Sequence, residues 1–165
     1  MAASEVVLVT DGGCITQARS GGWAAILIAV RDRMAEPIVP LINQETGTTH
    51  IKEFHGHVAD TTVNQMEILA VLQGLRQLSR RTKVRVISDS NLLVKTMTEG
   101  WKREKNDALW TVLDQEVAKH DIRWEWTKGH AANHWNKKAD ALVKQERVKP
   151  DDIPRIGDFL TGTSR

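Results

Sequence analysis

The pattern of apolar and polar positions predicts strands in the first part of the chain. Residues 5–11 are an almost unbroken run of Val and Leu, which is typical of a strand buried on both faces. Residues 23–30 form a second apolar run, and the glycine-rich segments 12–13 and 20–22 favour an antiparallel hairpin with a long connection. Residues 48–58 are a candidate third strand, whose weak alternation does not fix a register.

Helices and strands alternate in the second part of the chain. Apolar residues recur at steps of three and four from 62 to 78, as on the buried face of a helix. The sequence also predicts a strand at 84–88, helices at about 90–98 and 107–120, a strand at 122–127 and a last helix at about 135–147. A strand meander followed by this alternation predicts an α/β fold in which helices cover a mixed sheet.

Length and composition indicate one folded domain. The chain has 165 residues, of which 41% are hydrophobic and 27% charged, and this balance excludes a mainly disordered chain. We expect the domain at residues 1–147 and a loosely ordered tail at 148–165, although Ile156, Phe159 and Leu160 could dock on some apolar surface. A single cysteine excludes an internal disulfide.

Charge and hydropathy bear on partners and location. The 23 basic and 21 acidic residues leave a net charge of +2, which permits a polyanionic partner without requiring one. The longest apolar run is too short for a membrane-spanning helix, and the N-terminus lacks a charged-then-apolar leader. We therefore expect a soluble cytoplasmic protein with no membrane partner, and nothing in the sequence requires more than a monomer.

Three carboxylates stand where the predicted elements bring side chains together. Asp11 and Asp89 each end a predicted buried strand, and ligands bind at the carboxyl ends of strands in open α/β sheets. Glu67 shares the sheet-facing side of its helix with Val71 and Leu78. Buried carboxylates repel one another, so such a cluster either keeps protons or binds a cation, for which Mg²⁺ with its preference for oxygen ligands is suited.

Each acidic residue also has an ordinary explanation when it is taken alone. Asp11 before a glycine is a common turn residue, Glu67 could close a capping box with Asn64, and Asp89 could cap the helix that follows it. Asp140, on the last predicted helix, could be solvated. Only the joint pattern of these positions and their neighbours favours a chemical site.

Short motifs around these carboxylates resemble those of the type 1 ribonuclease H family. The motifs are Thr10-Asp11-Gly12-Gly13-Cys14, Asn64-Gln65-Met66-Glu67, Ser88-Asp89-Ser90 and Lys128-Gly129-His130-Ala131, followed by Asn136 and Asp140. The resemblance covers residues 5–147. It implies the ribonuclease H-like fold, a five-stranded mixed sheet with its first three strands antiparallel and helices on its faces. It also implies an endoribonuclease that hydrolyses the RNA strand of RNA/DNA hybrids and leaves 5′-phosphate and 3′-hydroxyl ends.

The resemblance assigns roles to individual residues. Asp11, Glu67, Asp89 and Asp140 would hold two Mg²⁺ ions, with Mn²⁺ as a possible substitute and with Asp11 between the ions. Two metals about 3.5–4 Å apart activate the attacking water and stabilise the leaving oxyanion. His130 would assist catalysis and product departure. The residues expected to contact the hybrid are Gly12, Cys14, Gln17, Asn64, Gln65, Trp101, Lys102, Arg103 and Asn136.

The sequence departs from the family pattern in several places. Val63 stands where many relatives have an asparagine, and its side chain cannot donate a hydrogen bond. Only residues 100–106 lie where many relatives insert a basic, tryptophan-rich protrusion, so the chain resembles a compact form, for which we expect no N-terminal hybrid-binding domain. Residues 31–60 are longer than the usual connection. His55 and His57 could ligate a transition metal, but two polar residues on an edge strand explain them better.

Two other functions are compatible with the same residues. A nuclease of the same superfold that acts on DNA, of the resolvase or transposase type, would use similar carboxylates. An inactive nucleic-acid-binding module is the third possibility, although such a protein would have little reason to keep every acidic position. Cleavage of a labelled hybrid, compared with duplex DNA and duplex RNA, separates the three.

Overall fold

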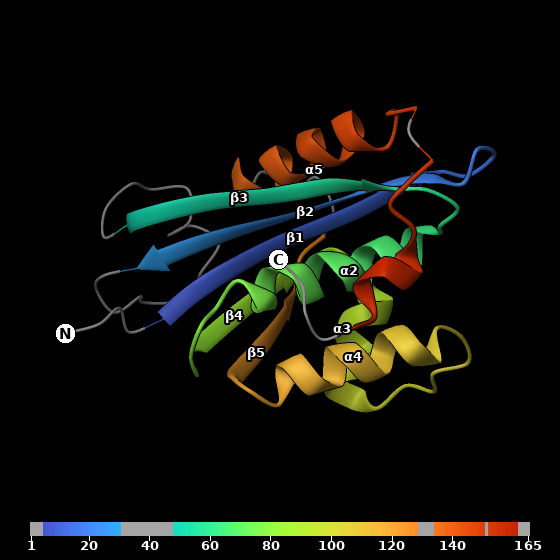
Figure 1. The fold of residues 1–165 in the computed structure, drawn as a ribbon. Coiled ribbons are helices and arrows are strands. Elements are labelled where there is room, and N and C mark those ends of the chain that lie inside the picture. The colour runs from blue at the N-terminus through green and yellow to red at the C-terminus, as the bar shows by residue number, and fades with distance from the viewer. Residues whose placement is uncertain (1–4, 31–47, 129–133, 151, 162–165) are drawn as a thin grey trace.

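A twisted mixed sheet lies between helices in the computed structural model, which describes residues 5–30, 48–128, 134–150 and 152–161 (Figure 1). Its strands are β1 Glu5–Ile15, β2 Ser20–Val30, β3 Thr48–Val58, β4 Lys83–Ser88 and β5 Asp121–Trp126. Within the described residues they form one five-stranded sheet of order β3-β2-β1-β4-β5. The β1–β2 and β2–β3 pairs are antiparallel and the β1–β4 and β4–β5 pairs are parallel, which confirms the predicted mixed sheet.

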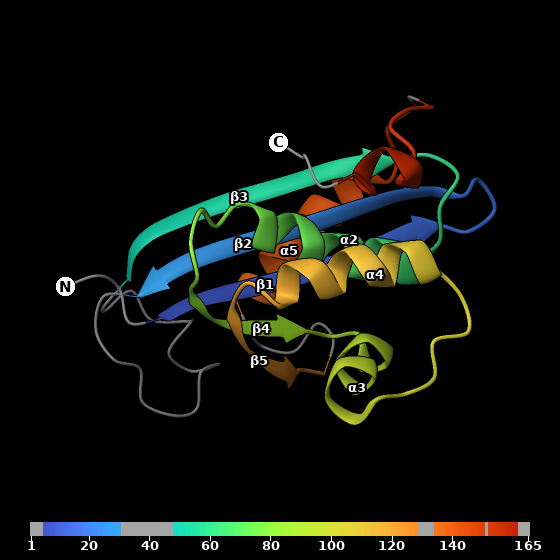
Figure 2. The ribbon, with the colours of Figure 1, turned by 60° about the horizontal axis from the view of Figure 1, so that its bottom comes forward.

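Helices cover both faces of the sheet (Figures 1 and 2). The helical elements are α2 Val63–Arg76, α3 Asn91–Glu99, α4 Asp107–Val117, α5 His134–Glu146 and the short 3₁₀ helix η1 Ile156–Phe159. Because side chains alternate along β1, Leu8 packs in the core on the α2 side while Val7 and Val9 pack in the core on the α5 side. Among the described helices, none has the length and apolar character needed to cross a bilayer.

The glycines that the sequence analysis assigned to the connection between the first two strands belong to the strands themselves. β1 continues to Ile15 and β2 begins at Ser20, so the turn is limited to residues 16–19. A Cβ on Gly12 would lie 2.5 Å from the Met66 carbonyl carbon, and a Cβ on Gly22 would lie 2.7 Å from the Val143 carbonyl oxygen. Glycine is therefore needed for α2 and α5 to approach the two faces of the hairpin, and it does not break the strands here.

The C-terminal segment 152–161 packs on the domain, which differs from the loosely ordered tail expected from the sequence. The Ala59 amide donates to the Pro154 carbonyl at 2.8 Å, and the Arg76 guanidinium donates to the Thr161 carbonyl at 2.8 Å. The possible docking of three apolar residues is confirmed, because all three pack against the α2-side core: Ile156, Phe159 and Leu160. The long connection noted in the sequence falls largely on 31–47, outside the described residues.

Candidate active site

The parallel pairing of β1 and β4 brings Asp11 and Asp89 together. Val9 lies opposite Ile87 in this pair, and both side chains pack in the core on the α5 side. Asp11 and Asp89 each follow two residues later, and a two-residue step along an extended chain keeps the same face. The two carboxylates therefore lie on the face that α5 covers, with Asp89 just after the end of β4. Asp11 lies within β1, which continues to Ile15, so the strand does not end at Asp11 as the sequence predicted.

Glu67 joins them from α2, on the opposite layer. It lies in the second turn of that helix and is only 7% exposed, as is Asp11. A Cβ on Gly12 would lie 2.6 Å from the Glu67 amide nitrogen, so the bare backbone at Gly12 is what allows Glu67 to come so close to β1. Thr62 caps α2 by accepting from the Gln65 amide at 3.2 Å, so a capping box with Asn64 does not explain Glu67.

The three carboxylates form one cluster. Asp11, Glu67 and Asp89 each offer an oxygen that lies within 4.8 Å of the others. Burial, followed by the charges of Asp89 and Asp140, raises the pKa of Asp11 to about 8. Burial, followed by the charges of Asp89 and Asp11, raises the pKa of Glu67 well above its usual range. Asp89 is not a helix cap, because the Ser90 hydroxyl caps α3 by accepting from the Leu93 amide at 3.1 Å.

Asp140 approaches the cluster from α5. Its charge acts on Asp11, and its carboxylate pairs with Lys144 one turn later at 3.0 Å. Asp140 therefore belongs to the same electrostatic site, although it does not share the 4.8 Å cluster of the other three. The fold thus draws carboxylates from β1, α2, the end of β4 and α5 to one place.

This donor set suits a hard divalent cation. The Glu67 Oε1 atom is buried and has no hydrogen-bond partner among the described residues. A buried carboxylate oxygen of this kind requires either a proton or a cation, and neighbouring negative charge makes a divalent cation the more favourable counter-charge. Carboxylate oxygens at short range are ligands that Mg²⁺ and Mn²⁺ accept readily. The cluster is therefore compatible with divalent metal binding.

The residues expected to contact a nucleic acid fall into two groups. Four have exposed side chains: Gln17 in the β1–β2 turn, Asn64 in the first turn of α2, and Trp101 and Lys102 in the linker after α3. Gly12 contributes only backbone, and His130 lies outside the described residues.

The remaining residues expected to contact a nucleic acid make contacts within the protein. Cys14 is half-buried, with its Sγ 3.5 Å from the Thr61 carbonyl, and Asn136 is buried on α5. The Arg103 guanidinium makes two hydrogen bonds to Asp114, of 2.6 and 3.0 Å, and lies over the Trp110 ring. The fold therefore uses Arg103 to hold the linker after α3 against α4.

Gln65 is fixed by a partner that the sequence analysis missed. Its side chain accepts from the Thr61 hydroxyl at 2.8 Å and donates to the Asn106 side chain at 3.1 Å. Asn106 has a backbone φ of 67° at the start of α4. Asparagine tolerates this left-handed conformation and is common at helix starts, so its position before a predicted helix was the available signal.

Sequence comparisons place the chain within a known family. A family model described as RNase H matches residues 3–148. Proteins named Ribonuclease H are 35% identical over 154 residues in Bordetella pertussis and 37% identical over 156 residues in Dinoroseobacter shibae. These matches cover 86% of this chain and 88% and 90% of the relatives. A Ribonuclease HI from Pseudomonas aeruginosa is 34% identical over 154 residues, which are 86% of this chain and 92% of the relative.

Solved structures show the same fold. A type 1 RNase H described as carrying the type 2 active-site motif superimposes with a TM-score of 0.69 at 23% identity, over 89% of this chain and 74% of that one. The N-terminal RNase H domain of a Mycobacterium tuberculosis protein superimposes with a TM-score of 0.67 at 21% identity, over 87% of this chain and 94% of that one. With the family model matching most of its length and relatives above 30% identity, the chain belongs to the RNase H family.

Proposed function

We propose that the protein is an endoribonuclease that hydrolyses the RNA strand of RNA/DNA hybrids and leaves 5′-phosphate and 3′-hydroxyl ends. The observation that carries this proposal is the buried carboxylate cluster of Asp11, Glu67 and Asp89, in a chain of the RNase H family. These buried acids repel one another, so the fold keeps them at an electrostatic cost. Such a cost is typical of a functional site.

Four carboxylates hold the cofactor in this proposal. Asp11, Glu67, Asp89 and Asp140 would hold two Mg²⁺ ions, with Mn²⁺ as an alternative. When bound, the metal supplies an activated water and stabilises the leaving oxyanion. Asp11 would be the central ligand of this set, because the charges of Asp89 and Asp140 both act on it. Lys144 pairs with Asp140 from the next turn of α5 and so orients that carboxylate.

His130 completes the catalytic set in this proposal. It lies ten residues before Asp140 and next to Gly129. A histidine side chain exchanges protons near neutral pH, so His130 can take up or release a proton at the scissile phosphate and assist product departure. Replacing His130 by Ala should slow turnover while the Mg²⁺ affinity stays unchanged. Equal turnover numbers for the two proteins would remove His130 from the mechanism.

The hybrid contacts the protein beside the carboxylates. Gln17, Asn64, Trp101 and Lys102 offer exposed side chains to it, while Gly12 and Cys14 contribute backbone and a half-buried thiol on β1. Gln65 and Asn136 border the site from α2 and α5. Arg103 has a supporting role here, since its guanidinium is engaged by Asp114 and its removal would release the linker that carries Trp101 and Lys102.

A cleavage assay with three substrates tests the proposal. We expect cleavage of a labelled RNA/DNA hybrid in Mg²⁺, none of duplex RNA or duplex DNA, and loss of cleavage in a chelator. Asp11→Asn should abolish hybrid cleavage, because it removes a central charged ligand. Asp121→Asn is the matched control, since Asp121 is an exposed carboxylate paired with Arg81 at the start of β5. Cleavage of duplex DNA would favour a resolvase-type nuclease, and binding without cleavage an inactive module.

The remaining expectations concern the state of the protein. We infer a catalytic domain at residues 1–147, on which the C-terminal segment packs, and a monomer that acts in the cytoplasm. Light scattering tests the monomer directly, because a dimer would double the mass of the 18.5 kDa chain.

A further inference from the structure

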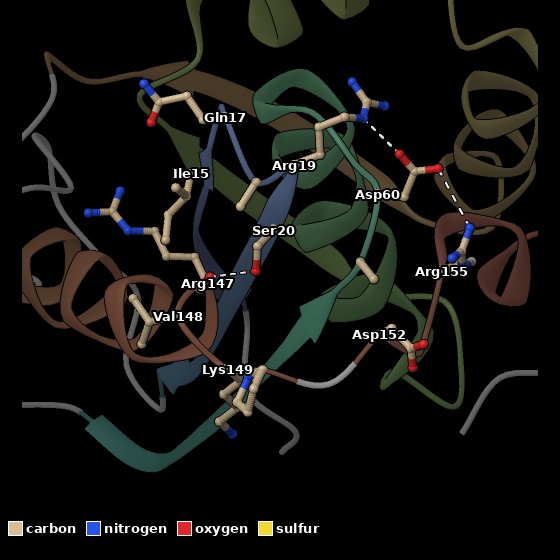
Figure 3. Close-up of a pocket in the computed structure, with 13 residues that line it drawn as sticks. Ile15, Gln17, Arg19, Ser20, Asp60, Arg147, Val148, Lys149, Asp152 and Arg155 are labelled. Carbon is tan, nitrogen blue, oxygen red and sulfur yellow. Dashed lines mark hydrogen bonds and ion pairs between the residues drawn. The ribbon is translucent and has the colours of Figure 1, made fainter.

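A basic cleft lies beyond the carboxylate cluster, between the β1–β2 turn, the C-terminal end of α5 and the segment that follows it (Figure 3). Its volume is about 530 Å³. Four cationic side chains line it, against two carboxylates, Asp60 and Asp152; the cations are Arg19, Arg147, Lys149 and Arg155. The lining therefore carries net positive charge.

Three of the four cations are paired within the protein. Arg19 binds the Asp60 carboxylate at 2.7 Å, and Arg155 approaches the same carboxylate at 3.6 Å (Figure 3). Lys149 pairs with Glu146 at 2.9 Å. Asp60 and Glu146 thus engage these three cations, with Arg19 and Arg155 sharing the one Asp60 carboxylate.

Arg147 differs from the others. In the described part of the chain its guanidinium forms no ion pair, and its buried Nε has no hydrogen-bond partner. Its backbone is fixed, because the Ser20 hydroxyl donates to the Arg147 carbonyl at 2.6 Å. Figure 3 shows the side chain extending past Ile15, on the side of the cleft away from Asp60 and Arg155. An unpaired guanidinium presents a planar pair of donors suited to a phosphate.

The position of Arg147 shows how far the cleft lies from the carboxylates. Its Nη1 lies 3.9 Å from where a Cβ on Gly13 would stand, and Gly13 is two residues beyond Asp11 on the same face of β1. Arg147 also follows Asp140 by seven residues, which is two helical turns or about 10 Å. Each strand of a duplex carries one phosphate per about 3.4 Å of its helix axis, so with that axis along α5 this distance corresponds to roughly three nucleotides.

We propose that this cleft binds a backbone phosphate of the substrate strand about three nucleotides from the cleavage point, with Arg147 as the contacting residue. The proposal rests on the hybrid nuclease function proposed above and extends its contact surface along β1. Arg147 holds the strand in register and takes no part in the chemistry, so it affects substrate binding and leaves the turnover number unchanged.

Steady-state cleavage of a long hybrid by Arg147→Gln tests this. We expect KM to rise about tenfold at unchanged kcat, and the salt dependence of log kcat/KM to lose about one unit of slope, as for one lost phosphate contact. Arg147→Lys keeps the charge and should recover most of the affinity. Arg81→Gln is the matched control, because Arg81 is an exposed arginine paired with Asp121, remote from the cleft.

Nested hybrids locate the contact. The penalty of Arg147→Gln should vanish when the strand on one side of the cleavage point is shorter than about three nucleotides. A penalty that persists at every length, or an unchanged KM and salt slope on the long hybrid, would overturn the proposal while hybrid cleavage itself stands. If the wild-type protein cleaves no hybrid, the proposed function fails and this proposal fails with it.

Two further measurements distinguish a phosphate contact by Arg147 from a structural role of the residue and from binding of a free anion. Circular dichroism should show that Arg147→Gln melts within a few degrees of the wild type; a large loss of Tm in both Arg147 variants would assign the residue a structural role and overturn the proposal. Inorganic phosphate is the other source of the same chemistry. A phosphate-induced rise in Tm that requires Arg147, together with an unchanged KM, would assign the cleft to a free anion instead.

Discussion

At the scale of one residue, the Asp11 side chain shows how burial and neighbouring charge disfavour the ionised carboxylate. Its pKa of about 8, caused first by burial and then by the charges of Asp89 and Asp140, means that the metal-free protein holds a proton there at neutral pH. Divalent metal binding must displace that proton, so metal affinity should increase as the pH rises.

Stability without metal should therefore depend on pH through Asp11. Between pH 3.8 and about 8 the folded state keeps a proton that the unfolded state releases, so the stabilisation present below pH 3.8 is lost progressively and is absent above pH 8. We expect the free energy of unfolding of the wild type in chelator to fall relative to that of Asp11→Asn across this range. Denaturant unfolding of both proteins from pH 5 to 9 measures it, and parallel curves would contradict it.

Gly12→Ala tests the close approach of β1 and α2. A Cβ there would meet the Met66 carbonyl carbon at 2.5 Å, and backbone cannot move aside as a flexible side chain does. We expect a loss of about 1–3 kcal/mol in the free energy of unfolding and weaker Mg²⁺ binding, because α2 carries Glu67 away from Asp11. Gly157→Ala is the control, since nothing lies within 4 Å of its added Cβ. Unchanged Mg²⁺ titrations would contradict this account of Gly12.

The carboxylates could be anticipated from the sequence because each is fixed by its own element. Asp11 and Asp89 follow apolar runs, and Glu67 lies on the apolar face of a periodic helix. The contacts of Gln65 and Arg103 could not be anticipated in this way. Their partners, Asn106 and Asp114, are polar residues whose direction depends on how α4 packs against its neighbours.

At the scale of elements, α5 is fastened to the edge strand β3 through Glu146. Its carboxylate, 4% exposed, lies 2.6 Å from His55 Nδ1 and 2.9 Å from Lys149 Nζ, and its backbone carbonyl lies 3.0 Å from His57 Nδ1. Burial alone would raise the pKa of Glu146, but the hydrogen bonds from Lys149 and His55 outweigh it and lower that pKa. The two histidines thus serve the packing of α5, as expected for polar residues on an edge strand.

Glu146→Gln should destabilise the fold in a pH-dependent way. Because the folded-state pKa lies below 4.5, the carboxylate stabilises the protein above pH 4.5, and this contribution is lost as the pH falls through the lowered value. We expect a loss of about 1–3 kcal/mol at pH 7 and a smaller loss near pH 3, measured by denaturant unfolding. Glu99→Gln, at an exposed pair with Lys95, should lower the free energy of unfolding much less. Equal effects of the two substitutions would contradict this assignment.

Element types could be predicted from periodicity, whereas the ends of β1 and β2 could not. Gly12 and Gly22 favour a turn by their local preference. In the folded protein two helices press on these positions and leave no room for a side chain, so tertiary packing decides their conformation. Strand ends that depend on such packing cannot be predicted from local sequence preference alone.

At the scale of the whole molecule, the segment 152–161 joins the end of the chain to its middle. It pairs with Ala59 after β3 and with Arg76 at the end of α2. Its docking was difficult to predict, because three apolar residues without periodicity do not identify an element. The core on which they pack includes Leu72 and Leu75, which precede them in the sequence by more than 80 residues.

Removing residues 150–165 should therefore loosen the region around Ala59. We expect Tm to fall by several degrees, at about 2–4 °C for each kcal/mol lost, because apolar contacts with the α2-side core disappear. Hydrogen exchange of the Ala59 amide, which donates to Pro154, should accelerate strongly. The Val86 amide within β4 is the internal control. An Ala59 amide that stays as protected as in the full chain would show that the segment contributes no stability there.

The same docking determines where the described part of the chain ends. Thr161 is held by Arg76 at the last turn of α2, whereas Glu67 lies nine residues earlier in that helix, about 14 Å along its axis. A fluorophore or a surface tether joined after Thr161 would emerge at the end of α2 remote from the acidic cluster. Immobilised or labelled protein prepared in this way leaves the approach to that cluster open, which suits single-molecule recording of strand cleavage.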